Sequence, residues 1–239
     1  GFNEENSWSQ QKEDELKRAR DFCAACQEGD IDTVQRLLPS ADVNRAHQLG
    51  RTPLSLACEK ESVEIVQLLL AVEGIGVNVK DGEGRTALNV ASQKGSTDMV
   101  VTLLQAEGID VNLPDKDGTS PLCWSSYKGH TEIVQRLLLS PDINVNQLRK
   151  GDASSLFMAC QNGKTEIVKL LVVARGINLE QPTSKGTTPL QVAQRKNHQE
   201  IVKLLLELRR RRELGFNEEN PWSQEKEEEL RRRNLGFNE

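Results

Sequence analysis

Apolar residues along the chain recur with a period of 34 residues. Each period carries a stretch such as Glu64-Ile65-Val66-Gln67-Leu68-Leu69-Leu70, in which the apolar positions follow one face of an amphipathic helix. We call a set of residues spaced 34 apart, which occupy equivalent positions of successive periods, a column. Three apolar columns are Leu54, Leu88, Leu122, Leu156 and Leu190; Val66, Val100, Val134, Val168 and Val202; and Leu69, Leu103, Leu137, Leu171 and Leu205. These columns predict stacked copies of one small unit, each burying its apolar face against its neighbours.

A shorter helix is predicted ahead of each of these stretches. Most periods open with a glycine turn and then Thr-Pro-Leu or a variant, as in Thr52-Pro53-Leu54. Proline suits the first turn of a helix, because the N–H that it lacks would have no helical partner there. The two helices of a period are then separated by a residue suited to a left-handed backbone, namely Gly95, Gly129, Gly163 and Asn197. Glu61 takes that place in one copy, which predicts a strained turn.

These motifs resemble the ankyrin repeat family, in which a β-turn precedes two antiparallel helices. Thr52-Pro53-Leu54-Ser55-Leu56-Ala57 is similar to the family's Thr-Pro-Leu-His-x-Ala, and the resemblance covers about residues 20–208. It implies an all-α solenoid of about six helix pairs, with capping pairs at both ends and the first helices lining a concave face. The family's histidine is replaced in every copy, which predicts a less rigid turn; the replacements are Ser55, Asn89, Cys123, Phe157 and Gln191.

The two ends of the chain carry the same segment. Residues 1–20 and 215–234 agree at 14 of 20 positions, and a further copy starts at Gly236-Phe237-Asn238-Glu239. Each copy predicts a linker followed by one charged helix, the C-terminal one spanning 221–235. We therefore expect three regions: an N-terminal segment with a capping helix (1–20), the repeat domain (21–214) and a helical C-terminal segment (215–239). The copies are interpreted as repeated linkers, with docking peptides as the alternative.

Composition and charge exclude several classes of function. The net charge of −5 argues against nonspecific nucleic-acid binding, and no apolar run approaches the length of a membrane span. Arg209–Arg212 continues a predicted helix and is interpreted as a solvated helix end. Cys23 and Cys26 have CxxC spacing but no second pair, and both fall in columns of small packing residues. We expect no catalysis, no cofactor and no metal site, and a cytoplasmic location with the nucleus left open.

The few aromatic residues indicate where a partner would bind. Trp124 and Tyr127 in one copy, and Phe157 and Met158 in the next, are placed by the resemblance together on the concave face. Aromatic residues of this kind anchor protein interfaces. The site predicted for a peptide or protein partner also includes charged turn tips: Arg51, Arg85, Lys116, Asp117 and Lys150.

Two other functions remain open at this point. The duplicated terminal segments could dock on another copy of the chain, or on the groove of their own chain in an autoinhibited form. Asn78, Asn112 and Asn146 occupy equivalent positions of successive repeats, and each of them follows a valine. They resemble ankyrin asparagines that are substrates of a hydroxylase.

Overall fold

The computed structural model describes residues 2–47 and 50–213, and side chains are described within 11–211. The described residues form twelve α-helices and one 3₁₀ turn, Leu38–Ser40. They contain no strand, and Leu148 and Ser154 form a single isolated bridge. The chain divides into two compact units, residues 1–116 and 117–239. This arrangement confirms the predicted six helix pairs, three in each unit.

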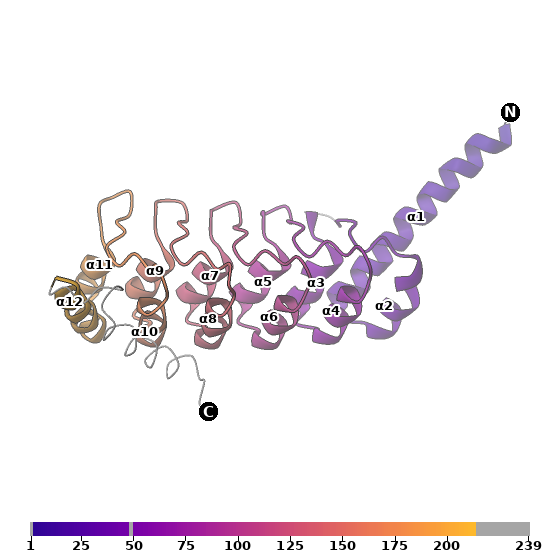
Figure 1. Cartoon of the computed structure of the whole chain (residues 1–239). Helices are drawn as coiled ribbons and strands as arrows, with labels where there is room; N and C mark the ends of the chain where they lie inside the picture. Colours follow the sequence, from indigo (N-terminus) through magenta and orange to yellow (C-terminus); the bar gives the residue numbers. More distant parts are fainter. Residues whose placement is uncertain (1, 48–49, 214–239) are drawn as a thin grey trace, which may run out of the picture. The chain divides into compact units, whose positions relative to one another are not determined.

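The first unit contains the pairs α1–α2, α3–α4 and α5–α6, in which α1, α3 and α5 form one layer and α2, α4 and α6 the other (Figure 1). Their bounds are α1 Phe2–Glu28, α2 Ile31–Leu37, α3 Pro53–Lys60, α4 Val63–Leu70, α5 Ala87–Lys94 and α6 Thr97–Leu104. The second unit repeats the plan, with α7, α9 and α11 in one layer and α8, α10 and α12 in the other. Their bounds are α7 Pro121–Lys128, α8 Thr131–Leu138, α9 Ser155–Gln161, α10 Thr165–Val172, α11 Pro189–Arg195 and α12 Gln199–Glu213.

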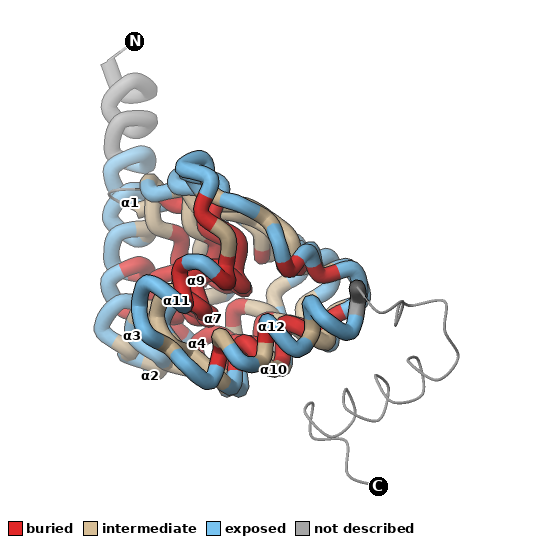
Figure 2. Tube along the Cα trace, turned by 90° about the vertical axis from the view of Figure 1, so that its left-hand side faces the viewer, coloured by how far each residue is buried: buried red, intermediate tan, exposed pale blue. Residues whose placement is uncertain are grey.

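The periodic apolar columns form the core of each unit. Leu69, Leu103 and Leu137 are fully buried in second helices, and Leu88 and Leu156 are fully buried in first helices. Figure 2 shows the buried residues gathered where the two helix layers face each other. Burial of a leucine side chain contributes about 1.5–3 kcal/mol. The columns read from the sequence are therefore the residues that hold neighbouring repeats together.

The first helix of each full repeat starts at a hydroxyl cap. The side-chain oxygen of the N-cap residue accepts the backbone N–H three residues later at Thr52, Thr86, Ser120, Ser154 and Thr188. Asn89 and Gln191, which replace the family's histidine, bond back to the N-cap N–H and complete capping boxes. The preceding turns are closed by backbone bonds as well, as between Asp81 N–H and the Arg85 carbonyl. Replacement of the histidine thus leaves the helix starts capped and the turns hydrogen-bonded.

The break between the two helices has a left-handed backbone in all five full repeats. The φ angles are 65° at Glu61, 91° at Gly95, 95° at Gly129, 66° at Gly163 and 60° at Asn197. A non-glycine residue is disfavoured in this region because its Cβ approaches the following carbonyl oxygen. The prediction of a strained turn at Glu61 is confirmed.

Asparagine side chains connect the loops of successive repeats. Asn78 donates from Nδ2 to the Gly108 carbonyl (2.7 Å) and accepts the Asp110 N–H at Oδ1 (3.0 Å). Asn146 makes the same two bonds to Gly176 and Asn178, and Asn44 makes them to Gly74 and Gly76. Each of these three asparagines thus links its loop to the next loop within the same unit.

The N-terminal segment differs from the prediction of a linker followed by a helix. Helix α1 begins at Phe2 and continues to Glu28, so the residues expected as a linker belong to the helix. The stretch contains neither glycine nor proline, so nothing in its sequence interrupts a continuous helix. The helix is anchored at its C-terminal end, where Phe22 and Cys26 are buried. The C-terminal segment with its predicted helix 221–235 lies outside the described residues.

Candidate interaction surface

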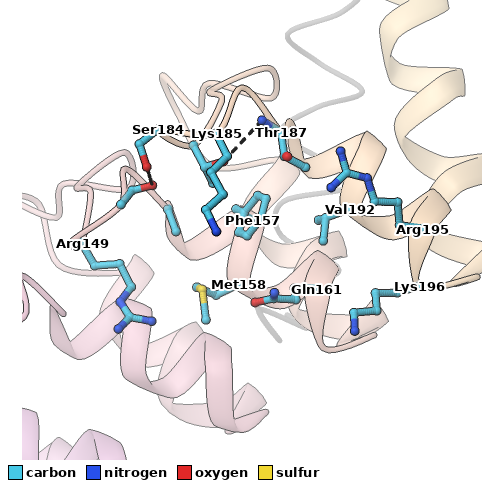
Figure 3. Close-up of a pocket in the computed structure, with 13 residues that line it drawn as sticks. Arg149, Phe157, Met158, Gln161, Ser184, Lys185, Thr187, Val192, Arg195 and Lys196 are labelled. Carbon is cyan, nitrogen blue, oxygen red and sulfur yellow. Dashed lines mark hydrogen bonds between the residues drawn. The ribbon is translucent and has the colours of Figure 1, made fainter.

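A pocket of about 380 Å³ opens on the α9–α11 side of the second unit (Figure 3). Its floor is apolar and is formed by Phe157, Met158 and Val192, which are 7%, 4% and 5% exposed. Met158 and Val192 are 34 residues apart, at equivalent positions of adjacent first helices. The repeat geometry therefore places two apolar side chains next to each other with their tips on the pocket surface.

The rim of this pocket is cationic. Arg149 and Lys185 come from two successive turns, and Arg195 and Lys196 come from the end of α11. Figure 3 shows the Lys185 side chain running from its loop toward Phe157, and the Arg149 side chain running toward Met158. The thirteen lining residues include no carboxylate. We refer to this site, with its apolar floor and its four cations, as the basic pocket.

The Arg149 side chain, which lines the pocket, has a buried donor without a hydrogen-bond partner among the described residues. This donor is its Nε. Buried donors in proteins are almost always paired, since an unpaired one costs roughly 1–3 kcal/mol. The guanidinium of Arg149, which lines the pocket, adds a positive charge that an anionic ligand could pair with.

The two aromatic residues predicted as anchors lie together on α7. The ring centroids of Trp124 and Tyr127 are 6.2 Å apart at an interplanar angle of 69°, an edge-to-face pair. Lys128 Nζ lies 5.6 Å from the centroid of the Tyr127 ring, which belongs to a 39% exposed residue. Trp124 and Tyr127 are equivalent to Met158 and Gln161 of the next repeat. The aromatic pair and the basic pocket thus belong to one first-helix surface of the second unit, defined by α7, α9, α11 and the turns before α9 and α11.

The predicted charged tips have different partners within their own units. Lys150 and Asp117 pair with each other at 2.8 Å, and this hydrogen bond and the Lys150 charge lower the pKa of the exposed Asp117 carboxyl. Lys116 is exposed on the first unit, and its backbone N–H bonds to the Glu83 carbonyl. Sequence reasoning identified Phe157 and Met158 of the basic pocket but missed Val192 and all four cations. The same 34-residue columns could have found Val192, which is equivalent to Met158.

Arg51 and Arg85 belong to an ion-pair network within the first unit. Arg85 bonds to Asp81 Oδ2 through two nitrogens, at 2.9 and 2.8 Å, and reaches Glu59 at 3.2 Å. Arg51 pairs with the same Glu59 at 3.0 Å. Burial alone would lower the pKa of Arg85, but its bonds to Asp81 and Glu59 outweigh this and raise it. Both arginines thus pair with Glu59 of α3, and Arg85 also bonds to Asp81 of its own turn.

The cysteines are buried and carry no sign of reactivity. Burial raises the pKa of the Cys26 thiol to about 12 and that of Cys23 to about 11, so both stay protonated near neutral pH. The thiolate is the reactive form, so these thiols are poor nucleophiles. Among the described residues no three His, Cys, Asp or Glu side chains gather as metal ligands would. No described helix is both long enough and apolar enough to cross a membrane.

Comparison with known proteins agrees with this architecture. A family model described as "Ankyrin repeats (3 copies)" matches residues 22–115, 70–149, 101–180 and 122–215. The crystal structure of the ankyrin repeat protein EF0377 is 24% identical, with a TM-score of 0.73 over 79% of this chain and 97% of that one. An ankyrin repeat domain from Acinetobacter baumannii is 25% identical, with a TM-score of 0.70 over 77% of this chain and 95% of that one. No curated protein matches the chain. Because the family matches cover residues 22–215 in one overlapping series, the chain belongs to the ankyrin repeat family.

Proposed function

We propose that the protein is a non-catalytic interaction module whose first-helix surface in the second unit binds an acidic peptide segment carrying a large apolar side chain. Ankyrin repeats generally mediate protein–protein interactions. The observation that carries the proposal is the basic pocket, in which four cations surround an apolar floor without a carboxylate among its lining residues.

The chemistry of the pocket selects for two features in one ligand. An apolar side chain would cover Phe157, Met158 and Val192, and burial of such a side chain contributes about 1.5–3 kcal/mol. Carboxylates beside it would pair with the four cations of the rim. Neither feature alone uses the whole site, so an acidic peptide without an apolar residue should bind less tightly.

The aromatic pair on α7 extends the surface along the repeats. First helices of adjacent repeats lie roughly 10 Å apart, so the span from α7 to α11 is about 20 Å. An extended peptide covers that distance with about six residues. A ligand anchored in the basic pocket would therefore reach Trp124 and Tyr127, which supply the second anchor.

The test is a fluorescence-anisotropy titration of a labelled acidic peptide containing phenylalanine against the full chain. Arg195→Glu/Lys196→Glu changes two exposed cations of the rim for which the structure gives no side-chain partner. Lys203→Glu/Arg210→Glu makes the same charge change on α12, away from the pocket, and serves as the matched control. We expect the first variant to lose at least tenfold in affinity and the control to stay within about twofold. Equal losses in both would leave only a general charge effect and refute the proposal.

A second variant tests the aromatic anchor. Trp124→Ala/Tyr127→Ala should weaken binding of a peptide long enough to span α7 to α11, while a four-residue peptide keeps its affinity. Unchanged binding of the long peptide would remove Trp124 and Tyr127 from the site.

A further inference from the structure

The tail, defined as residues 214–239, has the composition that the basic pocket requires. It contains seven Glu against four Lys and Arg, and it carries the motif Gly-Phe-Asn-Glu twice, at 215–218 and 236–239. Each copy places a phenylalanine two residues before a glutamate. This combination of an aromatic side chain with a nearby carboxylate matches a pocket with an apolar floor and a cationic rim. Both copies lie outside the 34-residue register of the repeats.

The position of each copy along the chain decides which one can reach the pocket. The tail starts after Glu213, at the end of α12, which belongs to the second-helix layer of its unit. The basic pocket lies on α9, α11 and their turns, in the other layer. Glu213 and Phe216 are three residue steps apart and span about 11 Å at most, about half of the roughly 20 Å thickness of two helix layers. The first copy is therefore too close to α12 to reach the pocket of its own chain.

The second copy has a sufficient tether. Residues 214–235 lie between α12 and Gly236. If 221–235 is helical, as its sequence predicts, those fifteen residues span about 22 Å and the other seven about 23 Å. The resulting reach of about 45 Å is twice the thickness of two helix layers, so Phe237 can pass from one layer to the other.

We propose that the tail folds over its own unit so that Gly236–Glu239 occupies the basic pocket as an intramolecular ligand, which rests on the proposed peptide-binding function. Phe237 covers the floor formed by Phe157, Met158 and Val192, and the Glu239 side chain meets the rim cations. A short tether supplies an effective concentration in the millimolar range, so even a weak motif competes with a partner in solution. The tail thereby sets a threshold that an external partner must exceed.

The experiment compares full-length variants in the same anisotropy titration with an acidic phenylalanine peptide in trans. Phe237→Ala/Glu239→Gln removes the proposed intramolecular ligand, and Phe216→Ala/Glu218→Gln makes the same changes in the copy that cannot reach. For a motif that binds with a dissociation constant of about 0.1 mM, a tethered concentration of about 1 mM weakens the external peptide about tenfold. We expect the first variant to bind the peptide about tenfold more tightly than the unmodified chain, and the control variant to match the unmodified chain.

The outcomes separate the two proposals. If no acidic peptide binds any of these proteins, the proposed function fails and the tail assignment fails with it. If the peptide binds all of them equally, the pocket stands as a peptide site and only the tail assignment is overturned. Sedimentation velocity at several concentrations should show a monomer. A dimer that Phe237→Ala/Glu239→Gln disrupts would place the motif in the pocket of a second copy and overturn the intramolecular assignment.

Discussion

Replacing Asn78 tests whether the asparagine column couples one repeat to the next. Asn78→Ala removes the bond from Nδ2 to the Gly108 carbonyl and the bond from the Asp110 N–H to Oδ1. A typical hydrogen bond contributes about 0.5–1.5 kcal/mol net, so two of them contribute about 1–3 kcal/mol. These bonds are exposed, and water can pair the two backbone groups in the variant. We therefore expect a loss of about 1–2 kcal/mol in the free energy of unfolding.

The assay is equilibrium unfolding in urea followed by far-ultraviolet circular dichroism, because the described chain is helical in every repeat. Repeat proteins depend on nearest-neighbour coupling, so the variant should unfold at lower urea and over a broader range. Asn78→Asp keeps the acceptor for Asp110 but loses the donor to Gly108, and should fall between Asn78→Ala and the unmodified chain.

Glu180 supplies the matched control. It occupies the same column in the last full repeat, where the structure gives its side chain no hydrogen bond to a following loop. Glu180→Ala should change stability by less than about 0.5 kcal/mol. If Asn78→Ala and Glu180→Ala shift the urea midpoint equally, the asparagine bonds do not couple the repeats.

Three further outcomes follow from the structure. Glu61 has a φ of 65°, so Glu61→Gly should stabilise the chain by about 1 kcal/mol in urea unfolding, less a small loss from the exposed Glu61–Lys94 pair. A variant that is less stable than the unmodified chain would contradict this. Arg85→Ala leaves the Asp81 carboxylate, only 1% exposed, without its cation, and should cost about 3 kcal/mol or more by the same measurement. Lys150→Ala removes the cation of the exposed Asp117 pair and should leave the urea midpoint nearly unchanged; equal shifts in the two variants would contradict this. Burial raises the folded pKa of Cys23, Cys26 and Cys160 from 9.0 to about 11–12, so their contribution to stability is complete below pH 9 and is lost as pH rises toward 11–12. The urea midpoint should therefore fall above pH 9, and less steeply in Cys26→Ala. A midpoint that stays constant above pH 9 would exclude this.

The architecture could be predicted from the sequence because every repeat shows the same pattern of apolar residues again. Leu54 alone could belong to many folds, but Leu54, Leu88, Leu122, Leu156 and Leu190 in one register fix the helix pairs and their buried faces. Glu61 could be identified as strained for the same reason, since its column contains only glycine and asparagine elsewhere. The beginning of α1 was not predictable in this way, because Phe2–Glu28 precedes the first full repeat and has no column to compare with.

The candidate site was only partly accessible from the sequence. A column states which residues are equivalent, but not how far a long charged side chain reaches or which partner it chooses. Arg85 was interpreted as a partner-binding tip, whereas in the structure it bonds to Asp81 and to Glu59 of the preceding repeat. Arg195 and Lys196 are two of 31 lysines and arginines, and the sequence does not set them apart from the others. Their place in the site follows only from the pocket, which is lined by residues of α9, of α11 and of the turns before these two helices.

A charge-swap binding measurement tests the central claim most directly. Two peptides that share one phenylalanine but carry either glutamates or lysines are titrated against the full chain and against Arg195→Glu/Lys196→Glu. If the basic pocket selects an acidic peptide through its cationic rim, the unmodified chain prefers the glutamate peptide and the variant reverses that preference. A preference that is the same for both proteins would contradict the account.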